Sequence, residues 1–358
     1  MKLLIVNNRP PHCGIGEYTF SLYGALKKLL GDDAELMSWQ AEVIEKIYSR
    51  VREHYILQYP EEAMRILSQF IFLLRIPHGY TVYHFTNSSL SLDIKRVRPC
   101  VVTVHDLIPF NAPRDLTDRL IRKSMRSLRH AQRIICVSQK TRSDLLRFLD
   151  IRPERVRIIY EGVNHDLFRP RDRARSREVL GIGQNKLMVL HVGSEEPRKN
   201  IPALVEAFCR LQRDVGEAVL VRVGEKTAAV QRQIDSLKLN DKVLYFQNTM
   251  NLEYFYNAAD MLVFPSFEEG FGFPPLQAMA SGCPVIASNT TSIPEVVGDA
   301  GILLDPADAA GLAHWMREVY VSRELKSSLI EKGLRRSQMF SWEKVARETV
   351  EVYREAIS

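Results

Sequence analysis

The sequence has few cysteines, and their placement excludes several classes of protein. Its 358 residues contain five, at positions 13, 100, 136, 209 and 283, and this wide spacing matches no metal-binding motif. Four of them neighbour or lie in strand-like apolar runs, which favours buried, reduced thiols in a cytosolic protein. We therefore expect no bound metal and a cytoplasmic location.

Long hydrophobic runs are also missing. Residues 1–7 are too short an apolar stretch for a targeting peptide and are typical of a first strand. The longest apolar stretch, 66–76, is interrupted by Ser68, Gln69 and Arg75. Since about 20 apolar residues are needed to cross a bilayer, the sequence predicts no membrane span.

Positive charge is in moderate excess, with 49 Lys and Arg against 43 Asp and Glu, a net charge of +6 and a pI of about 9.0. Such an excess favours an anionic partner. Zinc-finger spacing, an RNP-like aromatic motif and a basic arm are all missing, which argues against nucleic acid. An anionic membrane surface or a phosphate-bearing substrate explains the same charge.

The alternation of short β-branched runs with helical patterns predicts parallel α/β sheets. The length favours two domains, and the charged segment 168–175 is predicted to link them. We therefore expect two Rossmann-like domains. The predicted strands are residues 2–7, 81–85, 101–105, 133–137, 157–160, 187–192, 218–223, 243–246, 261–264, 284–287 and 301–304.

A loop with two carboxylates and two glycines follows the strand at 261–264 and opens a helix at about Pro275. Glycines let backbone amides approach a ligand closely, and a helix N-terminus favours negative charge. A carboxylate beside them can accept hydrogen bonds from sugar hydroxyls. The βαβ unit completed by residues 284–288 therefore predicts an anion and hydroxyl site beyond the carboxyl ends of its strands.

Residues 265–286 read Pro-Ser-Phe-Glu-Glu-Gly-Phe-Gly-Phe-Pro-Pro-Leu-Gln-Ala-Met-Ala-Ser-Gly-Cys-Pro-Val-Ile. This run resembles the signature of the retaining glycosyltransferases of family 4, the group 1 glycosyl transferases, which have the GT-B fold. The resemblance implies two Rossmann-like domains facing a central cleft, with a C-terminal helix that crosses back to the first. It implies acceptor binding by residues 1–168 plus about 341–358, and donor binding by 169–340.

The same resemblance assigns residues to the donor. In the family, one glutamate lies at the donor sugar and a second at the ribose hydroxyls. The first maps onto Glu269, and the second onto Gln277, which is a departure. Gln277 can still form hydrogen bonds, but it lacks the charge that strengthens them, so we expect altered nucleotide contact. The amides of Gly270, Phe271 and Gly272 are expected to face the donor diphosphate.

Two adjacent cations, Arg198 and Lys199, precede a helix predicted from about Ile201. Cations at a helix N-terminus are unfavourable unless an anion joins them, so the pair marks a site. The family uses an Arg and a Lys of this loop to neutralise the donor diphosphate. Lys199 aligns with the family lysine, whereas Arg198 must serve for an arginine that many relatives carry where Ser194 stands. Gly193 belongs to the same predicted donor-binding loop.

The first domain carries further candidates. His105 and Asp106 end a strand, and the resemblance implies that His105 contacts the donor sugar rather than being satisfied locally at a sheet edge. Gly14 and Gly16 open a helix after the first strand and resemble the glycine loop of these transferases. In the second domain, Asn248 ends the strand where relatives bind the nucleobase.

No catalytic or binding role is predicted for three positions in the first domain. Ser138 is expected to cap the helix that follows it. Glu161 and Asn164 stand where relatives often have Asn-Gly-Val-Asp, so both depart from the family pattern.

Two segments bear on membrane contact. Residues 61–76 predict a helix apolar around most of its circumference, either buried in the first domain or dipping into a bilayer to meet a lipid-linked acceptor. Within residues 117–133, arginines at 119, 122, 126, 129 and 133 recur at three- and four-residue steps, which predicts one basic helix face. Such a face favours an anionic partner, including the inner surface of a membrane.

The resemblance implies a retaining transfer of a hexose from a GDP- or UDP-linked donor to a hydroxyl of a glycan or lipid-linked acceptor. No cofactor other than this donor is expected, and no metal, because Arg198 and Lys199 would stabilise the leaving diphosphate. His105 and Glu269 would hold the sugar, and the acceptor would attack from the front face. The alternatives are a nucleotide-sugar epimerase, a sugar phosphorylase, or a non-catalytic sugar-nucleotide-binding partner.

Overall fold

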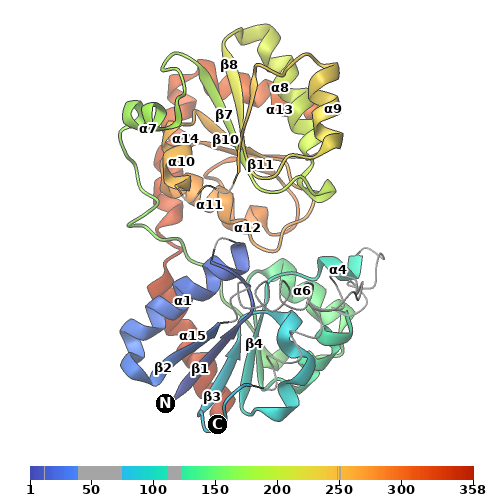
Figure 1. Cartoon of the computed structure of the whole chain (residues 1–358), viewed down its shortest axis with the longest axis vertical. Helices are drawn as coiled ribbons and strands as arrows, with labels where there is room; N and C mark the ends of the chain where they lie inside the picture. The colour runs from blue at the N-terminus through green and yellow to red at the C-terminus, as the bar shows by residue number, and fades with distance from the viewer. Residues whose placement is uncertain (12, 39–74, 112–121, 248, 250) are drawn as a thin grey trace, which may run out of the picture. The chain divides into compact units, whose positions relative to one another are not determined.

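A computed structural model describes residues 1–11, 13–38, 75–111, 122–247, 249 and 251–358 (Figure 1). The chain divides into two compact units, the first made of Met1–Gly162 with Trp342–Ser358 and the second of Val163–Ser341. The sequence predicts domain limits at residue 168 and at about 340. Asn248, Arg119 and most of the predicted helix at 61–76 lie outside the described residues.

The first unit is built on a parallel sheet. Its described strands run in the order β2-β1-β3-β4-β5-β6. Their bounds are β1 Leu3–Asn7, β2 Ala34–Ser38, β3 Val82–Phe85, β4 Cys100–Val104, β5 Arg133–Cys136 and β6 Val156–Ile158. The register pairs Leu3 of β1 with both Ala34 of β2 and Val82 of β3. The chain passes from β1 to β2 on one side of the sheet and then to β3 on the other side of β1. This change places a topological switch point at the carboxyl ends of β1 and β3.

Helices cover both faces of this sheet. The described helices and 3₁₀ turns are α1 Gly14–Leu30, η1 Gly31–Asp33, η2 Ser88–Arg96, α4 Ile108–Asn111, η3 Arg126–His130, α6 Gln139–Phe148, η4 Pro153–Arg155 and α15 Trp342–Ile357. The side chain of Ser138 accepts from the amide of Thr141, so Ser138 caps α6 as expected. Helix α15 packs against α1 and the central strands (Figure 1).

A buried chain of hydrogen bonds fixes α15 to the sheet. The hydroxyl of Tyr353 on α15 lies 2.7 Å from Nδ1 of His84 on β3, and Nε2 of His84 lies 2.8 Å from the hydroxyl of Thr103 on β4. Thr103 in turn lies 3.0 Å from the hydroxyl of Tyr18 on α1. Burial lowers the pKa of His84 to about 3, so its ring is neutral. The network therefore joins four elements without burying a charge.

The second unit contains another parallel sheet. Its described strands run in the order β12-β11-β10-β7-β8-β9. Their bounds are β7 Leu187–Val192, β8 Ala218–Val223, β9 Val243–Phe246, β10 Met261–Phe264, β11 Val285–Ser288 and β12 Ile302–Leu304. The first four match the predicted ranges to the residue, because these parallel strands are short, predominantly apolar runs.

Two layers of helices enclose this sheet. One layer contains α8, α9 and α13, whose apolar residues such as Phe208 and Met316 join the strand residues in one core. The other contains α7, α10, α11 and α14 (Figure 1). The bounds are α7 Arg173–Leu180, η5 Pro197–Lys199, α8 Ile201–Val215, α9 Ala228–Ser236, α10 Leu252–Ala258, α11 Phe273–Ala280, α12 Ile293–Val297, α13 Ala309–Val321 and α14 Arg323–Ser337.

The prediction of a linker over 168–175 is wrong, because the whole segment lies within the second unit and its last three residues open α7. Asp172 accepts a hydrogen bond from the amide of Arg175 and caps α7, which begins at Arg173. The buried guanidinium of Arg177 lies 2.9 Å from a carboxylate oxygen of Asp260, and Arg173 and Lys326 each lie 2.7 Å from the other oxygen. Arg173 of this segment, with Arg177 just beyond it, therefore helps to neutralise a buried carboxylate.

The prediction of one basic helix face over 117–133 is also wrong. Residues 122–125 are helical, η3 follows at Arg126–His130, and Arg133 is the first residue of β5. Arg133 Nε lies 3.0 Å from Glu355 of α15, so this arginine serves packing inside the unit.

Among the described helices, none has the length and apolarity that crossing a bilayer requires.

Candidate active site

The order of strands in the second unit brings two loops together. From β7 the chain continues through β8 to β9 on one side, whereas β10 lies on the other side of β7 and is followed by β11 and β12. Ligands of such sheets bind at the carboxyl ends of the two strands where the direction reverses. Here these are β7, followed by residues 193–200, and β10, followed by residues 265–272. Both predicted donor-binding loops therefore lie at this switch point.

The two loops are joined by ion pairs. Lys199 Nζ lies 2.6 Å from Oε1 of Glu269, and Arg198 Nη1 lies 3.3 Å from Oε2. Arg198 also donates to the carbonyl of Glu268 and to the carboxylate of Glu196. The side chains of Lys199 and Glu269 are about one-tenth exposed, at 11% and 10%. The structure thus brings together three of the four predicted catalytic residues in one partly desolvated cluster.

A largely buried network supports the first loop, residues 193–200. The amide of Gly193 donates to Val223, and its carbonyl accepts from Arg222 Nη2 at 3.2 Å. Gly193 has φ of 142°, a conformation that favours glycine. Arg222 also contacts Nδ1 of His191 and lies 3.6 Å from Glu195. Burial, Arg222 and Lys199 hold the pKa of His191 well below its ordinary value, so this ring is neutral.

Glu195 ties the same loop to the N-cap of α9 and to strand β9. Its carboxylate accepts from the amide and hydroxyl of Thr227, each at 2.6 Å, and from the hydroxyl of Tyr245 at 2.6 Å. Ser194, the residue where many relatives carry arginine, donates to Glu196 at 2.9 Å. Positions 194–196 therefore fix the shape of the loop that presents Arg198 and Lys199.

The turn at Glu268–Gly272, which carries the two carboxylates and two glycines, is held by hydroxyl groups from residues 288–295. Ser292 Oγ donates to the carbonyls of Glu269 and Phe271 at 3.0 and 2.9 Å, and the amide of Glu269 donates to Thr291 Oγ1 at 3.2 Å. Gly272 has φ of 121°, and a Cβ there would meet Ile293 Cδ1 at 2.8 Å. Since Ser292 binds the carbonyls, it fixes the direction of the intervening peptide groups, including Gly270.

Gln277 and Phe271 are buried, at 2% and 4% exposure. The amide oxygen of Gln277 accepts from the hydroxyl of Tyr256 at 2.8 Å. The ring of Phe271 packs edge-on against Phe273 and Phe340, so its side chain belongs to the packing of the turn.

The first-unit candidates also follow strands of their own sheet. Gly14 is the first residue of α1, and Gly16 lies in its first turn. A Cβ at Gly16 would stand 1.7 Å from the carbonyl oxygen of Pro10, so this glycine is required by the close approach of α1 to the loop after β1. His105 directly follows β4, and its side chain is 12% exposed. Its ring contacts Tyr18 edge-on, with centroids 4.7 Å apart.

Sequence reasoning missed the partner of His105. Glu161, given no role there, is buried, and its Oε1 lies 2.8 Å from Nδ1 of His105. Both residues follow strands of one sheet, β4 and β6, and that shared position was the signal available in the sequence.

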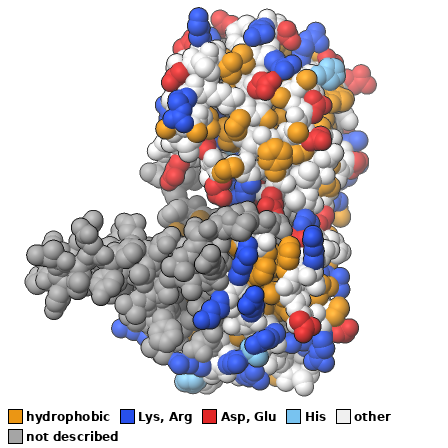
Figure 2. All heavy atoms as spheres, turned by 90° about the vertical axis from the view of Figure 1, so that its right-hand side faces the viewer, with side chains coloured by type: hydrophobic (Ala, Val, Ile, Leu, Met, Phe, Trp, Pro, Cys, Tyr) orange, Lys and Arg blue, Asp and Glu red, His pale blue; other side chains and the backbone are white. Residues whose placement is uncertain are grey.

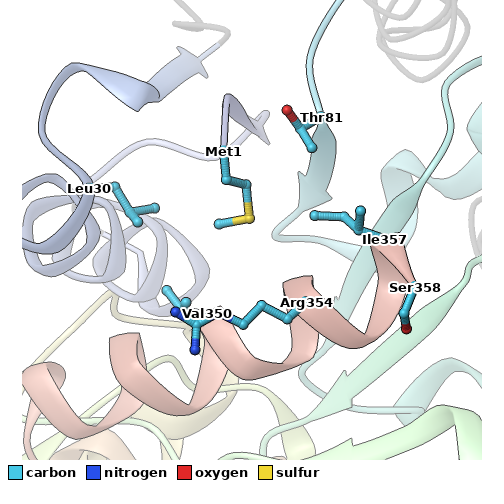
Figure 3. A pocket seen from close by; sticks show the side chains of 7 residues that line it. All are labelled: Met1, Leu30, Thr81, Val350, Arg354, Ile357 and Ser358. Carbon is cyan, nitrogen blue, oxygen red and sulfur yellow. The ribbon is translucent and has the colours of Figure 1, made fainter.

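An apolar pocket of about 650 Å³ lies elsewhere in the first unit (Figure 3). Its lining includes Met1 and Thr81, which precede β1 and β3, and Val350 and Ile357 of α15. It is thus at the amino ends of the strands, opposite the edge that carries His105. Among the described residues, no group of three His, Cys, Asp or Glu side chains could hold a metal.

Two doubly wound parallel units, each with its polar candidates at the carboxyl edge of its sheet, have the GT-B fold of nucleotide-sugar-dependent transferases. The family model "Glycosyl transferases group 1" matches residues 172–336, and "Glycosyltransferase Family 4" matches residues 14–167. The chain belongs to the group 1 glycosyl transferases of glycosyltransferase family 4, and the predicted family and fold class are confirmed.

Similar proteins agree with this assignment. The O-antigen chain mannosyltransferase B of Escherichia coli is 30% identical over 76% of this chain and 74% of its own length. The MMP alpha-(1->4)-mannosyltransferase of Mycolicibacterium hassiacum is 33% identical over 65% of this chain, and the match spans 56% of that relative.

Among solved structures, sucrose-phosphate synthase from Thermosynechococcus elongatus superimposes with a TM-score of 0.77 at 22% identity, covering 98% of both chains. Anabaena HepE, in complex with UDP and glucose, superimposes with a TM-score of 0.75 at 20% identity, also over 98% of both chains. These likenesses show the fold.

Proposed function

We propose that this glycosyltransferase moves a hexose from a GDP- or UDP-linked donor to a hydroxyl of a glycan or lipid-linked acceptor, with retention of anomeric configuration. The observation that carries the proposal is the cluster of Arg198, Lys199 and Glu269 at the switch point of the second unit. Two cations that share one carboxylate match the charge of a diphosphate, which can replace that carboxylate as their partner. Glu269 is then released toward the hydroxyls of the sugar.

The relatives support the sugar class. Two of the similar proteins are named as mannosyltransferases, one of them acting in O-antigen chains. HepE was solved with UDP and glucose, and separately with UDP-glucose. A nucleotide-activated hexose is therefore the donor class that we propose, and a carbohydrate or lipid-linked carbohydrate is the acceptor class. The second unit would bind the donor and the first the acceptor.

The proposed chemistry uses the residues of the chain and no metal. Arg198, Lys199 and the amides of Gly270–Gly272 stabilise the charge that grows on the departing diphosphate. Gly193 and Ser194 shape the loop beneath it, and Gln277 with Asn248 contributes to binding of the nucleoside. Glu269 and His105 hold the sugar, and Gly14 and Gly16 of the first unit also contribute to donor binding. The acceptor hydroxyl attacks from the face that the diphosphate leaves, and its proton passes to that diphosphate.

We also propose a cytoplasmic enzyme that touches the anionic inner face of a membrane. Figure 2 shows Lys and Arg side chains gathered on one face of the first unit. Exposed Lys95, Arg98 and Arg129 belong to this unit, and burial together with these cations and Arg155 lowers the pKa of His130. Four cations that repel one protonated imidazole form a local positive field, which favours anionic lipid headgroups.

The test combines binding and turnover. Thermal melting with GDP-mannose, GDP-glucose, UDP-glucose, UDP-N-acetylglucosamine, GDP and UDP identifies the nucleotide and sugar, because a ligand that binds the folded state raises the melting temperature. The selected donor is then incubated with carbohydrate and polyprenyl-linked acceptors, with and without EDTA. Proton NMR of the product reports its anomeric configuration.

We expect stabilisation by one nucleotide series, transfer that EDTA leaves unchanged, and a product with the donor's configuration. Inverted configuration would refute retention, and loss of activity with EDTA that added metal restores would refute metal independence. Donor consumption without any acceptor would favour an epimerase instead. A Lys199→Ala variant that keeps full turnover would remove the diphosphate assignment.

A further inference from the structure

The His105–Glu161 pair constrains the protons on both side chains. His105 Nε2 lies 2.9 Å from the backbone carbonyl oxygen of Thr86, and Nδ1 lies 2.8 Å from Glu161 Oε1. A carbonyl oxygen can only accept a hydrogen bond, so Nε2 carries a hydrogen. Both ring nitrogens are thus engaged within the first unit, and the lone pair that a base would need is not presented at Nε2.

One proton then remains to be placed between Nδ1 and Glu161. If it resides on Nδ1, the pair is an imidazolium with a carboxylate. If it resides on Glu161, the pair is a neutral imidazole with a carboxylic acid. The geometry of a charge-assisted pair at 2.8 Å, with the second N–H satisfied by a carbonyl, is that of an imidazolium whose two donors each have an acceptor.

The other groups around His105 favour the same placement. From α1, the ring of Tyr18 lies edge-on to the imidazole, and burial raises the pKa of Tyr18 so that its hydroxyl stays neutral. From β3, His84 is neutral, so no second imidazolium opposes the first. Asp106, the next residue along the chain, adds negative charge. Burial lowers the pKa of His105, but its bond to Glu161 and that carboxylate's charge outweigh burial and raise it. Burial also raises the pKa of Glu161, against the bond to His105, so the placement of the proton rests on the two hydrogen bonds of the ring.

We propose that Glu161 is a positioning residue that keeps His105 doubly protonated, so that this histidine acts toward the sugar only as a hydrogen-bond donor and never as a base. The inference rests on the proposed function for its ligand, the hexose of the donor. Glu161 does not itself touch the sugar in this account. It holds Nδ1, while the Nε2 hydrogen can pass from the Thr86 carbonyl to a hydroxyl oxygen of the sugar.

The pairing predicts what a sugar must offer at this point. A charged N–H binds an oxygen lone pair, so the contacting hydroxyl acts as acceptor there and directs its own hydrogen elsewhere. A deoxy sugar at that carbon removes the acceptor and leaves the imidazolium without its new partner, which costs binding. The family pattern at position 161 is therefore replaced here by a residue with a distinct task.

The protonation state can be measured without any substrate. The full chain is labelled with ¹⁵N-histidine, and the His105 signals are assigned by their loss in His105→Gln. We expect both ring nitrogens of His105 to show imidazolium shifts from pH 6 to pH 8. In Glu161→Gln, whose amide can donate to Nδ1, we expect a neutral ring protonated at Nε2. A neutral His105 ring in the unaltered protein at pH 7 would overturn the proposal, even if Glu161→Gln failed to fold.

The kinetic readout uses matched variants. Replacing a charged donor by a neutral one weakens a hydrogen bond by roughly half, so we expect kcat/KM for the donor to fall about tenfold in Glu161→Gln. Exposed Glu154 lies in the same unit, and Glu154→Gln is the control that keeps full activity. Unchanged kcat/KM in a folded Glu161→Gln enzyme would refute the role toward the sugar.

The two readouts separate this inference from the proposed function. An imidazolium signal that depends on Glu161, in a protein that uses no sugar donor, would refute the transferase proposal and leave the pairing intact. Transfer activity in a protein whose His105 is neutral would refute the pairing and leave the transferase proposal intact.

Discussion

The Lys199 ammonium lies 2.6 Å from a carboxylate oxygen of Glu269, although 70 residues separate the two in the chain. They meet because β7 and β10 are neighbours across the point where the sheet reverses its direction of growth. The same carboxylate reaches Arg198. One acidic side chain thus balances both cations proposed to bind the diphosphate, and donor binding exchanges one anion for another.

Replacing Lys199 by Ala should lower turnover most. A cation that stabilises charge on a leaving group contributes to the transition state more than to substrate binding, so we expect kcat to fall about 10²–10³-fold. Steady-state kinetics with the identified donor measures the loss. Lys186→Ala, an exposed lysine of the same unit, is the matched control and should keep wild-type kcat. Equal kcat in both variants would contradict the role of Lys199.

Restoring the family glutamate at Gln277 should tighten nucleotide binding. The hydroxyl of Tyr256 donates to the amide oxygen of Gln277 and can equally donate to a carboxylate. A charged acceptor strengthens ribose hydrogen bonds, so we expect Gln277→Glu to lower the Kd for the nucleoside diphosphate about tenfold. Isothermal calorimetry measures it. Because position 277 is buried, the same change should lower Tm without ligand, and weaker nucleotide binding would count against ribose contact.

Asp260→Asn should destabilise the second unit by about 3–5 kcal/mol, because it leaves the buried guanidinium of Arg177 without its counter-charge. Burial raises the pKa of Asp260, but Lys326 and Arg173 outweigh it and hold the pKa below its ordinary value. The contribution of Asp260 to the free energy of unfolding is therefore fully present above about pH 3.9, the ordinary pKa of an unfolded Asp. It is lost as the pH falls through the lower pKa of Asp260 in the folded protein. Urea unfolding at pH 7 and at acid pH measures both effects.

The control for Asp260→Asn is Glu178→Gln, which removes an exposed ion pair with Arg175. We expect this change to cost less than about 1 kcal/mol. Similar losses in the two variants would show that the buried cluster is not special.

Two glycines of α1 should respond oppositely to alanine. A methyl group at Gly16 would stand 1.7 Å from a backbone oxygen, so Gly16→Ala must displace α1 and should lower Tm by several degrees. Gly24 has open space around its Cβ position, and Gly24→Ala should stabilise the helix by about 0.5–1 kcal/mol. Thermal melting of both variants measures these effects, and an unchanged Tm in Gly16→Ala would refute the close approach of α1 to the Pro10 carbonyl.

Membrane contact predicts loss of vesicle binding when basic residues of the first unit are neutralised. Each basic side chain near an anionic surface contributes about 1 kcal/mol, so replacing Lys95, Arg98 and Arg129 by Gln should weaken binding about a hundredfold. Co-sedimentation with phosphatidylglycerol vesicles measures it, and added salt should reduce binding by the wild type.

A variant with the same loss of charge in the second unit serves as the control. Lys186, Arg232 and Arg323 are exposed there, and their replacement by Gln should leave vesicle binding unchanged. Equal losses in both triple variants would indicate that vesicle binding depends on net charge alone and not on a particular surface of the first unit.

Local pattern was enough to predict most of the fold. The buried strands of the second unit were predictable because they are mostly apolar, with polar residues such as His191 in β7 and Arg222 in β8 as exceptions, and α8 begins at the predicted Ile201. The edge strand β2, Ala34–Ser38, was missed because only Ala34 is fully buried and Glu35 and Ser38 interrupt the apolar pattern. The charged segment 168–175 was misjudged because Asp260, the partner of Arg173, is more than 80 residues away in the chain.

The candidate site was predictable where a motif fixes spacing and unpredictable where partners come from distant strands. Arg198, Lys199 and Glu269 could be named from two loops, but their ion pairing depends on strand order. Glu161 was passed over because sequence shows no distance between positions 105 and 161. Its role depends on β4 and β6 ending at the same edge of one sheet.

The docking of Tyr353 against His84 has a consequence for how the chain acquires its structure during synthesis. The second unit is one continuous stretch and can close as soon as it leaves the ribosome. The first unit, begun earlier, lacks α15 until the second unit has been synthesised, because residues 342–357 follow that unit in the chain. The unit begun first therefore cannot finish folding before the second unit has been made.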